Sequence, residues 1–395
     1  MTTSNLARRA SDAARESQES REEGPIAYNP GTLTDPLPAV ERAMSSFRRE
    51  VRGRPQAAYV KGRAALGTLR RAASEVFGGE PHNWAMADGH TATIDRLSNC
   101  IGQMFGARGG VHVVSTVCEH IGGLGAFTAD PRVAVTQVPV EEIVDTPGNL
   151  YFISHLAYDT NRDNSAEITA LVNREDRPIV IVDGSQAIGQ VPVNVKALGC
   201  HAYLSSAHKW LAGPQGTGLL YLRDDVIEAW PSPFRAGEPL DPTYPIGRWE
   251  PRGGQDFSRI AGLEAAIREY EANAHRGRDV RVIFVRGLKR VLGSHVHILP
   301  ESAPHGRVVA FEILDCDVYP VYRALGERGV TLKCIKKSGP DDSYAFEVLR
   351  AGFPWWTSAA KVRDALSILK RVHAEVTNGA APIESPAITA EIVAA

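Results

Sequence analysis

Two residues that could do covalent chemistry each follow an apolar run in the middle of the chain. Asp183 ends the run PIVIVD, and Lys209 comes just after the run AYLSS at 202–206. Ligands of open α/β sheets bind beyond the carboxyl ends of the strands, so we expect both side chains at one crevice. A lysine amine can form a Schiff base, and a carboxylate can keep a pyridine nitrogen protonated. Together they indicate a pyridoxal phosphate (PLP) site, although each alone could be a helix cap or a solvated charge.

The segment ADGHTATIDRLSN at 87–99 has the residues of a phosphate site. Gly89, His90 and Thr91 directly precede a helical pattern. A helix N-terminus offers unpaired N–H groups and the positive end of the helix dipole to a phosphate. Capping by Asp88 or Thr91 would explain the same residues without a ligand.

Apolar runs of strand length alternate with helical patterns between residues 111 and 222. These runs lie at 111–115, 132–138, 150–154, 178–183, 202–206 and 217–222. Continuous Val, Ile and Leu are typical of a parallel sheet covered by helices on both faces. From about residue 258 the pattern becomes helical, with strand-like runs at 308–314 and 345–350. The sequence therefore predicts an α/β domain followed by a small α+β domain.

Composition limits the function classes. The chain has 395 residues, 43% of them hydrophobic and 23% charged, with a net charge of -2, so no strong field would attract nucleic acid. Its five cysteines are odd in number and lack CxxC spacing, which argues against disulfides and a zinc site and favours a reducing cytoplasm. We expect no metal, no membrane association and a cytoplasmic location, since no apolar run has spanning length and the N-terminus lacks the apolar core of a secretory signal.

We predict five segments along the chain. The first residues are too polar to offset the entropy lost on ordering, and the last ones are small and interrupted by proline. The segments are a disordered tail at 1–24, an N-terminal segment at 25–50 that packs with the small domain, a large PLP-binding domain at 51–290, a small C-terminal domain at 291–377 and a flexible tail at 378–395.

The stretch VDGSQAIGQVPVNVKALGCHAYLSSAHKWLAGPQGTGLLYLR resembles the cofactor signature of the class V aminotransferase family, the cysteine-desulfurase-like branch of fold-type I PLP enzymes. An Asp-Gly-x-Gln motif precedes a Ser-x-His-Lys motif, and a Gly-Pro-x-Gly-x-Gly turn follows. The resemblance runs in order across residues 25–375 and is strongest from 85 to 225. It implies an α/β fold with a mostly parallel, seven-stranded-type sheet sandwiched by helices, plus the small α+β domain.

The resemblance also implies the cofactor contacts. Lys209 would carry the cofactor and move the proton at Cα, Asp183 would pair with the pyridine nitrogen, and Gln186 would bind the phenolic oxygen. The phosphate would be bound by His90, Thr91, Ser206 and His208. His90 stands where the family commonly has a hydroxyl residue.

Further residues would act on the cofactor ring or the substrate. His120, after Glu119, would stack on the ring and transfer protons. Arg350 would hold the substrate α-carboxylate, because a guanidinium fork matches a carboxylate. Tyr158 replaces the Asn of a family motif, and Asn29 lies in an N-terminal segment that covers the site.

Two departures from the family pattern affect the expected function. Ser338 stands where desulfurases carry their persulfide-forming cysteine, and Cys334 comes too early in a strand-like run. Without that thiolate we do not expect desulfurase activity. Gly254 replaces a Thr that reaches the phosphate of a neighbouring subunit, and the resemblance still implies a homodimer with sites near the interface.

The motifs identify the cofactor and leave the reaction open. We expect an amino acid or amino-acid conjugate that is bound as an external aldimine and loses its Cα proton. β-Elimination by a C–S lyase on a cysteine S-conjugate is favoured. An epimerase resembling isopenicillin N epimerase, an aminotransferase and an oxidative deaminase of specialised metabolism stay open, and the retained site residues argue against an inactive scaffold.

Overall fold

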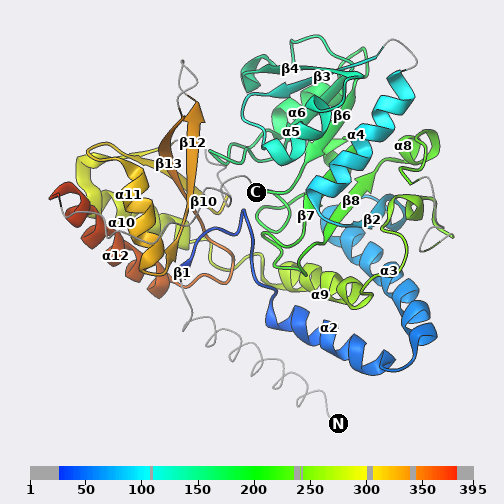
Figure 1. The fold of residues 1–395 in the computed structure, drawn as a ribbon, viewed down its shortest axis with the longest axis horizontal. Coiled ribbons are helices and arrows are strands. Elements are labelled where there is room, and N and C mark those ends of the chain that lie inside the picture. Colours follow the sequence, from blue (N-terminus) through cyan, green and yellow to red (C-terminus); the bar gives the residue numbers. More distant parts are fainter. Residues whose placement is uncertain are drawn as a thin grey trace.

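The computed structural model describes residues 26–106, 110–234, 241, 243–299, 306–338 and 344–379. The tails predicted at 1–24 and 378–395 lie outside the described residues, except for residues 378 and 379, which follow the final helix. Figure 1 shows a large lobe built on one sheet and a small lobe beside it that carries α10, α11 and α12.

The large lobe contains a seven-stranded sheet in the order β2-β8-β7-β6-β5-β3-β4. The strands are β2 (Trp84–Ala87), β3 (Val111–Thr116), β4 (Val133–Val138), β5 (Leu150–Ser154), β6 (Ile179–Asp183), β7 (Ala202–Ser206) and β8 (Gly218–Leu222). Neighbours from β4 to β7 are parallel, whereas β8 is antiparallel to both β7 and β2. The predicted α/β architecture with a mostly parallel sheet is confirmed, and β2 is a strand that the sequence did not predict.

Helices cover both faces of this sheet because its central strands are apolar on both faces. Val180 and Val182 of β6 pack into one core, whereas Ile181 between them packs into another. The first core is covered by α2 (Pro38–Val51), α3 (Pro55–Phe77), α6 (Ser165–Val172), α7 (Val195–Leu198) and α9 (Ser258–Asn273). The second is covered by α4 (His90–Gly106), α5 (Ile121–Thr128) and α8 (Asp224–Ala229). The edge strand β4 is the exception, since its residues are half-buried or exposed.

The small lobe contains an antiparallel sheet in the order β12-β13-β10-β9. Its strands are β9 (Val296–Ile298), β10 (Val308–Ile313), β12 (Lys333–Ser338) and β13 (Tyr344–Gly352). The helices α10 (Val280–Leu292), α11 (Val318–Glu327) and α12 (Ala359–Thr377) share its hydrophobic core. The predicted strands at 308–314 and 345–350 correspond to β10 and β13.

A short N-terminal strand also belongs to the small lobe. β1 (Ile26–Ala27) runs parallel to β11 (Val330–Thr331). In the described residues, four 3-10 turns lie at Pro81–Asn83, Val140–Glu142, Pro245–Trp249 and Gly293–His295.

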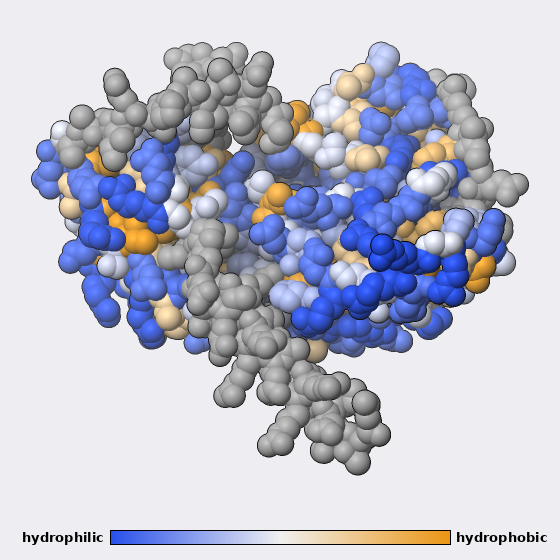
Figure 2. Space-filling view, turned by 60° about the horizontal axis from the view of Figure 1, so that its bottom comes forward, coloured by the Kyte–Doolittle hydropathy of each residue, from blue (hydrophilic) through white to orange (hydrophobic). Residues whose placement is uncertain are grey.

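The exact domain limits stay a prediction. Among the residues that the structure describes, no helix combines the length and apolarity needed to cross a membrane. Figure 2 shows one face on which hydrophilic residues predominate and hydrophobic ones form small groups.

Candidate active site

A cavity of about 790 Å³ lies at the carboxyl ends of β5, β6 and β7, and residues of the small lobe complete its wall. Ten of the predicted site residues line it: His90, Thr91, His120, Tyr158, Asp183, Gln186, Ser206, His208, Lys209 and Arg350. Asn29 is not among the lining residues. It accepts a hydrogen bond from the Thr32 hydroxyl at 3.1 Å, and Thr32 itself lies on the wall.

Asp183 ends β6 as a buried carboxylate. Its Oδ1 accepts a hydrogen bond from the Ser185 amide at 2.8 Å, and its Oδ2 lies 3.1 Å from Nε2 of His90. Nε2 of His90 is close enough to Asp183 for an ion pair, but its orientation does not give a hydrogen bond. Burial by itself would raise the pKa of Asp183, yet His90, Lys209 and the Ser185 bonds hold it below its usual value. The site therefore keeps a negative charge at its base.

The glycine after Asp183 is required by close packing. A Cβ at Gly184 would lie 1.9 Å from Cε1 of Tyr203. Tyr203 is fully buried and its hydroxyl lies 2.8 Å from Nδ1 of His155. The turn that places Asp183 at the cavity thus leaves no room for a side chain.

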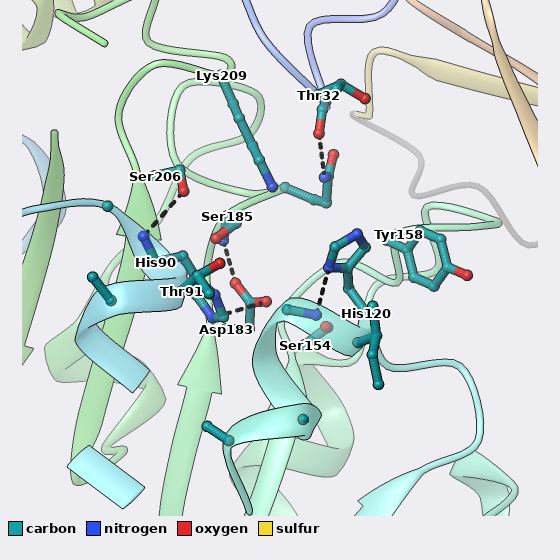
Figure 3. Close-up of a pocket in the computed structure, with 18 of the residues that line it drawn as sticks. Thr32, His90, Thr91, His120, Ser154, Tyr158, Asp183, Ser185, Ser206 and Lys209 are labelled. Carbon is teal, nitrogen blue, oxygen red and sulfur yellow. Dashed lines mark hydrogen bonds and ion pairs between the residues drawn. The ribbon is translucent and has the colours of Figure 1, made fainter. Parts of the chain in front are cut away.

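Lys209 follows β7 and is partly accessible through the cavity. Figure 3 shows its side chain extending between His90 and Ser206 on one side and His120 and Tyr158 on the other. Desolvation lowers its pKa, and the positive charges of Arg350 and Lys333 lower it further, against the opposing effect of Asp183. A lysine of lowered pKa is available as a nucleophile and as a base.

The N-terminus of α4 forms one end of the cavity. Gly89, with φ of 98°, makes the turn from β2 into this helix. The backbone N–H of His90 donates to the Ser206 hydroxyl at 3.2 Å, and Thr91 and His208 line the same cavity. Nδ1 of His208 is buried without a hydrogen-bond partner among the described residues. This combination of a helix N-terminus, hydroxyls and an unsatisfied imidazole fits a phosphate.

The His90 side chain turns away from that phosphate end. Its ring is directed to Asp183, and only its backbone lies at the helix start. Burial lowers the pKa of His90, and the charge of Asp183 opposes this shift. A direct contact between this side chain and a phosphate stays a prediction, whereas its contact with the carboxylate of Asp183 is observed.

His120 is the N-cap residue of α5. Its Nδ1 accepts a hydrogen bond from the Gly122 amide at 3.0 Å, so a neutral ring carries its proton on Nε2. The ring meets Tyr158 edge-on, with centroids 5.3 Å apart. Although solvent reaches it through the open cavity, the protein around its other sides lowers its pKa by desolvation, and Lys209 adds to this. His120 is therefore neutral and able to donate a hydrogen bond from Nε2.

Arg350 lies on β13 and is 4% exposed. Its Nη1 donates to the Tyr158 carbonyl, and its Nη2 would lie 2.5 Å from a Cβ at Gly31. Gln186 packs at the same glycine: its Nε2 donates to the Gly31 carbonyl at 3.0 Å and its Oε1 accepts from Trp210 at 3.0 Å. The N-terminal segment thus holds both polar side chains at the cavity wall.

Two features of the site were not assigned by sequence reasoning. Glu119 is buried and joins β3 to β5, since its Oε1 accepts from the Ser154 amide at 2.9 Å and from the Thr116 hydroxyl at 3.0 Å. Burial raises its pKa to about 7. Lys333, the first residue of β12, lines the cavity from the small lobe. The signal that could have identified Lys333 was the alternation along β12, in which polar Lys333 is followed by the buried Cys334.

The comparisons agree with this geometry. The profile of the family described as "Aminotransferase class-V" matches residues 140–339, which is half of the chain. The chain therefore belongs to the class V aminotransferases, a family of PLP-dependent enzymes. Its lysine, carboxylate and helix N-terminus fit the aldehyde, the ring nitrogen and the phosphate of that cofactor.

Curated relatives cover part of the chain. A cysteine desulfurase of Enterobacter sp. (strain 638) is 28% identical over 211 residues, which are 49% of this chain and 51% of the relative. A cysteine desulfurase of Shigella flexneri is 25% identical over 233 residues, or 55% and 56% of the two chains. The chain thus spans about half the length of the curated relatives it matches.

Solved structures share the fold over more of the chain. A C-DES mutant with glycine covalently linked to its PLP cofactor has a TM-score of 0.75 at 21% identity, covering 89% of this chain and 98% of its own. The cystine C–S lyase C-DES in complex with cysteine persulfide has a TM-score of 0.74 at 21% identity, covering 88% and 98%. The fold is that of the PLP-dependent fold-type I enzymes.

Proposed function

We propose that the protein is a PLP-dependent C–S lyase that eliminates a thiol from the β-carbon of a cysteine S-conjugate. The convergence of Lys209, Asp183 and the α4 N-terminus in one cavity is the observation that carries the proposal. When bound, pyridoxal phosphate supplies the electron sink that stabilises a carbanion at the substrate Cα.

Each polar residue of the cavity has one task in this proposal. Asp183 keeps a proton on the ring nitrogen, and the α4 N-terminus with Ser206 binds the phosphate. Arg350 fixes the substrate α-carboxylate, which orients the Cα–H bond toward Lys209. Lys209, as a base of lowered pKa, removes the Cα proton.

Elimination then breaks the bond between the β-carbon and sulfur. Its electron pair leaves with sulfur, and the leaving thiolate needs a proton unless it is a stable anion. The proton that Lys209 has taken from Cα is passed to sulfur, and His120, whose Nδ1 is occupied by the Gly122 amide, can donate a hydrogen bond from Nε2–H to the leaving thiolate. The balance is one Cα proton that Lys209 takes and passes to sulfur, one thiol and one 2-aminoacrylate, which hydrolyses to pyruvate and ammonia.

Cys334 does not suit a persulfide mechanism. It lies in the small-lobe core, is 8% exposed, and burial raises the pKa of its thiol to about 12. β-Elimination does not require a thiolate from the protein, because the thiolate leaves once the Cα proton is removed. The absence of a reactive Cys334 thus favours simple elimination over desulfuration.

A desulfurase is the second candidate, and one residue favours it. Cys118 is exposed and near enough to Tyr158 to raise the pKa of that phenol, after the larger effects of burial and Asp159. A thiol close to Tyr158, which lines the cavity, is a candidate sulfur acceptor. A Cys118→Ser variant that keeps full activity would exclude this role.

The reaction is tested by product analysis with holoenzyme and S-ethyl-L-cysteine. The proposal predicts equal amounts of ethanethiol and pyruvate, and none from Lys209→Ala, with Cys118→Ser as the matched active control. Deuterium exchange at Cα without thiol release would indicate an epimerase. A keto acid that retains sulfur would indicate transamination, and alanine from L-cysteine would indicate a desulfurase.

We also propose a homodimer in the cytoplasm, from the family resemblance alone. A Cβ at Gly254, where relatives offer a hydroxyl to a neighbouring subunit, would have open space within 4 Å. Light scattering of the holoenzyme should give twice the mass of one chain, and a monomer with full activity would contradict the shared site.

A further inference from the structure

Two cationic side chains lie beside each other on neighbouring strands of the small-lobe sheet, at the wall of the cavity. Lys333 of β12 and Arg350 of β13 are direct cross-strand partners, and both line the cavity. Directly opposed residues have Cβ atoms about 5 Å apart and side chains on the same face. Their positive charges therefore act on the same part of the cavity.

The charge of Lys333 reaches the reacting groups. Desolvation lowers the pKa of Lys333, and the charge of Arg350 lowers it further. Lys333 in turn contributes to the lowered pKa values of Lys209 and His120. Lys333 lines the same cavity as Lys209 and His120, so its charge acts inside that cavity.

The described part of the chain gives Lys333 no ion-paired carboxylate. Asp183 is engaged by His90 and Ser185, and Asp159 acts on Arg350. Like charges directly opposite on neighbouring strands are destabilising unless something compensates them. An anion bound between them would do so.

The anionic groups of the proposed reaction do not account for every cation that lines the cavity. The cofactor phosphate belongs at the α4 N-terminus, and the substrate α-carboxylate belongs at Arg350, which Tyr158 and Gly31 hold in place. Lys333 has no task in that arrangement. A second anion on the substrate would give it one.

We propose that Lys333 is a distal anion subsite, and that the substrate class is an amino acid whose side chain or S-substituent ends in a carboxylate. This inference rests on the proposed function, because Arg350 is taken as the α-carboxylate site. A charge-assisted contact in such a partly desolvated pocket should favour the anionic substrate about tenfold to a hundredfold.

Two nearly isosteric probes test the subsite. S-Carboxymethyl-L-cysteine and S-carbamoylmethyl-L-cysteine differ by a carboxylate in place of an amide. Dissociation constants are measured from the change in the visible spectrum of the holoenzyme. The wild type should bind the carboxymethyl probe at least about tenfold more tightly, Lys333→Met should bind both equally, and Lys333→Arg should restore the preference.

Controls separate the distal site from a shared α-carboxylate site. Arg350→Lys should weaken both probes, whereas Lys289→Met, at the end of α10, should change neither. If Lys333→Met weakens both probes equally, Lys333 binds the α-carboxylate with Arg350 and the distal subsite is overturned. A preference that survives in Lys333→Met overturns it as well.

A second readout needs no reaction. Isothermal titration with succinate and with succinamate compares a dianion with its monoamide, and neither has an amine that could react. A succinate preference that Lys333→Met abolishes supports the subsite even if no C–S bond is cleaved, in which case only the proposed reaction fails. Cleavage of S-ethyl-L-cysteine without any charge preference in either assay would remove the subsite and leave the reaction.

Discussion

Replacing Arg350 by alanine removes the cation proposed to bind the substrate α-carboxylate. Arg350 is 4% exposed, and burial lowers its pKa to about 10, so it still carries its charge at neutral pH. Its Nη1 is used by the Tyr158 carbonyl and its Nη2 packs at Gly31, so a ligand would meet a guanidinium that is already partly engaged. The variant therefore tests one contact of defined geometry.

The expected loss follows from that environment. Truncating one partner of a buried, hydrogen-bonded charge pair costs about 2–5 kcal/mol. The cavity is open to water on one side and part of the guanidinium is already engaged, so we expect about 2–3 kcal/mol, or about a 30- to 150-fold rise in KM. Lys209 is untouched, so the loss should fall mainly on KM, with a smaller fall in kcat because the Cα–H bond is less well oriented. Arg350→Lys keeps a charge without the fork and should raise KM about tenfold.

The assay is steady-state pyruvate formation from S-ethyl-L-cysteine. Arg323→Ala, an exposed α11 residue that pairs with Glu327, is the matched control and should change neither constant. A circular dichroism melt checks that each variant is folded. An unchanged KM with a kcat lowered a hundredfold would refute the reasoning, because it would place Arg350 in the chemical step instead of in carboxylate binding.

Three further predictions concern stability. Gly184→Ala puts a methyl group 1.9 Å from the Tyr203 ring and should lower the free energy of unfolding by at least about 2 kcal/mol, measured by urea titration; an unchanged midpoint would disprove the steric argument. His155 is buried, and desolvation lowers its pKa from 6.5. Below about pH 6.5 the unfolded chain therefore binds a proton that the native chain does not. As a result, the free energy of unfolding decreases as the pH is lowered. His155→Gln should remove up to about 1.4 kcal/mol per pH unit of that fall, measured by urea titrations at neutral and mildly acidic pH, whereas an equally steep fall would show that His155 titrates normally. Arg70 is 1% exposed and pairs with the buried Glu250 at 2.9 Å; Arg70→Met should cost about 3 kcal/mol in a thermal melt, with part regained in the double variant with Glu250→Gln, and no loss would contradict a role for this ion pair.

The sequence predicted the strands β3 to β8 from their apolar runs, most of which are buried on both faces. The run at β6 is continuous because Val180 and Val182 pack on one face and Ile181 on the other. β2, Trp84–Ala87, is an apolar run of only four residues, too short to be assigned as a strand from the sequence alone. Its place in the sheet is set by antiparallel pairing with β8, which is distant in sequence.

The candidate site was predictable where backbone position decides it. Asp183, Ser206 and Lys209 follow strand ends, and parallel strands bring such ends to one edge of the sheet. Side-chain direction was not predictable in the same way. The His90 ring turns to Asp183 instead of to the helix start, which the residue type does not reveal, and Lys333, within the basic run TLKCIKK, has the composition of a solvated face.

The most direct test of the central claim is to find where the cofactor is attached. The protein is reconstituted with pyridoxal phosphate, reduced with borohydride, digested and mapped by mass spectrometry. We predict a phosphopyridoxyl group on Lys209, absent from Lys209→Ala. A stably attached group on another lysine, such as Lys333, or no attached group at all, would contradict the assignment of this cavity as a PLP site.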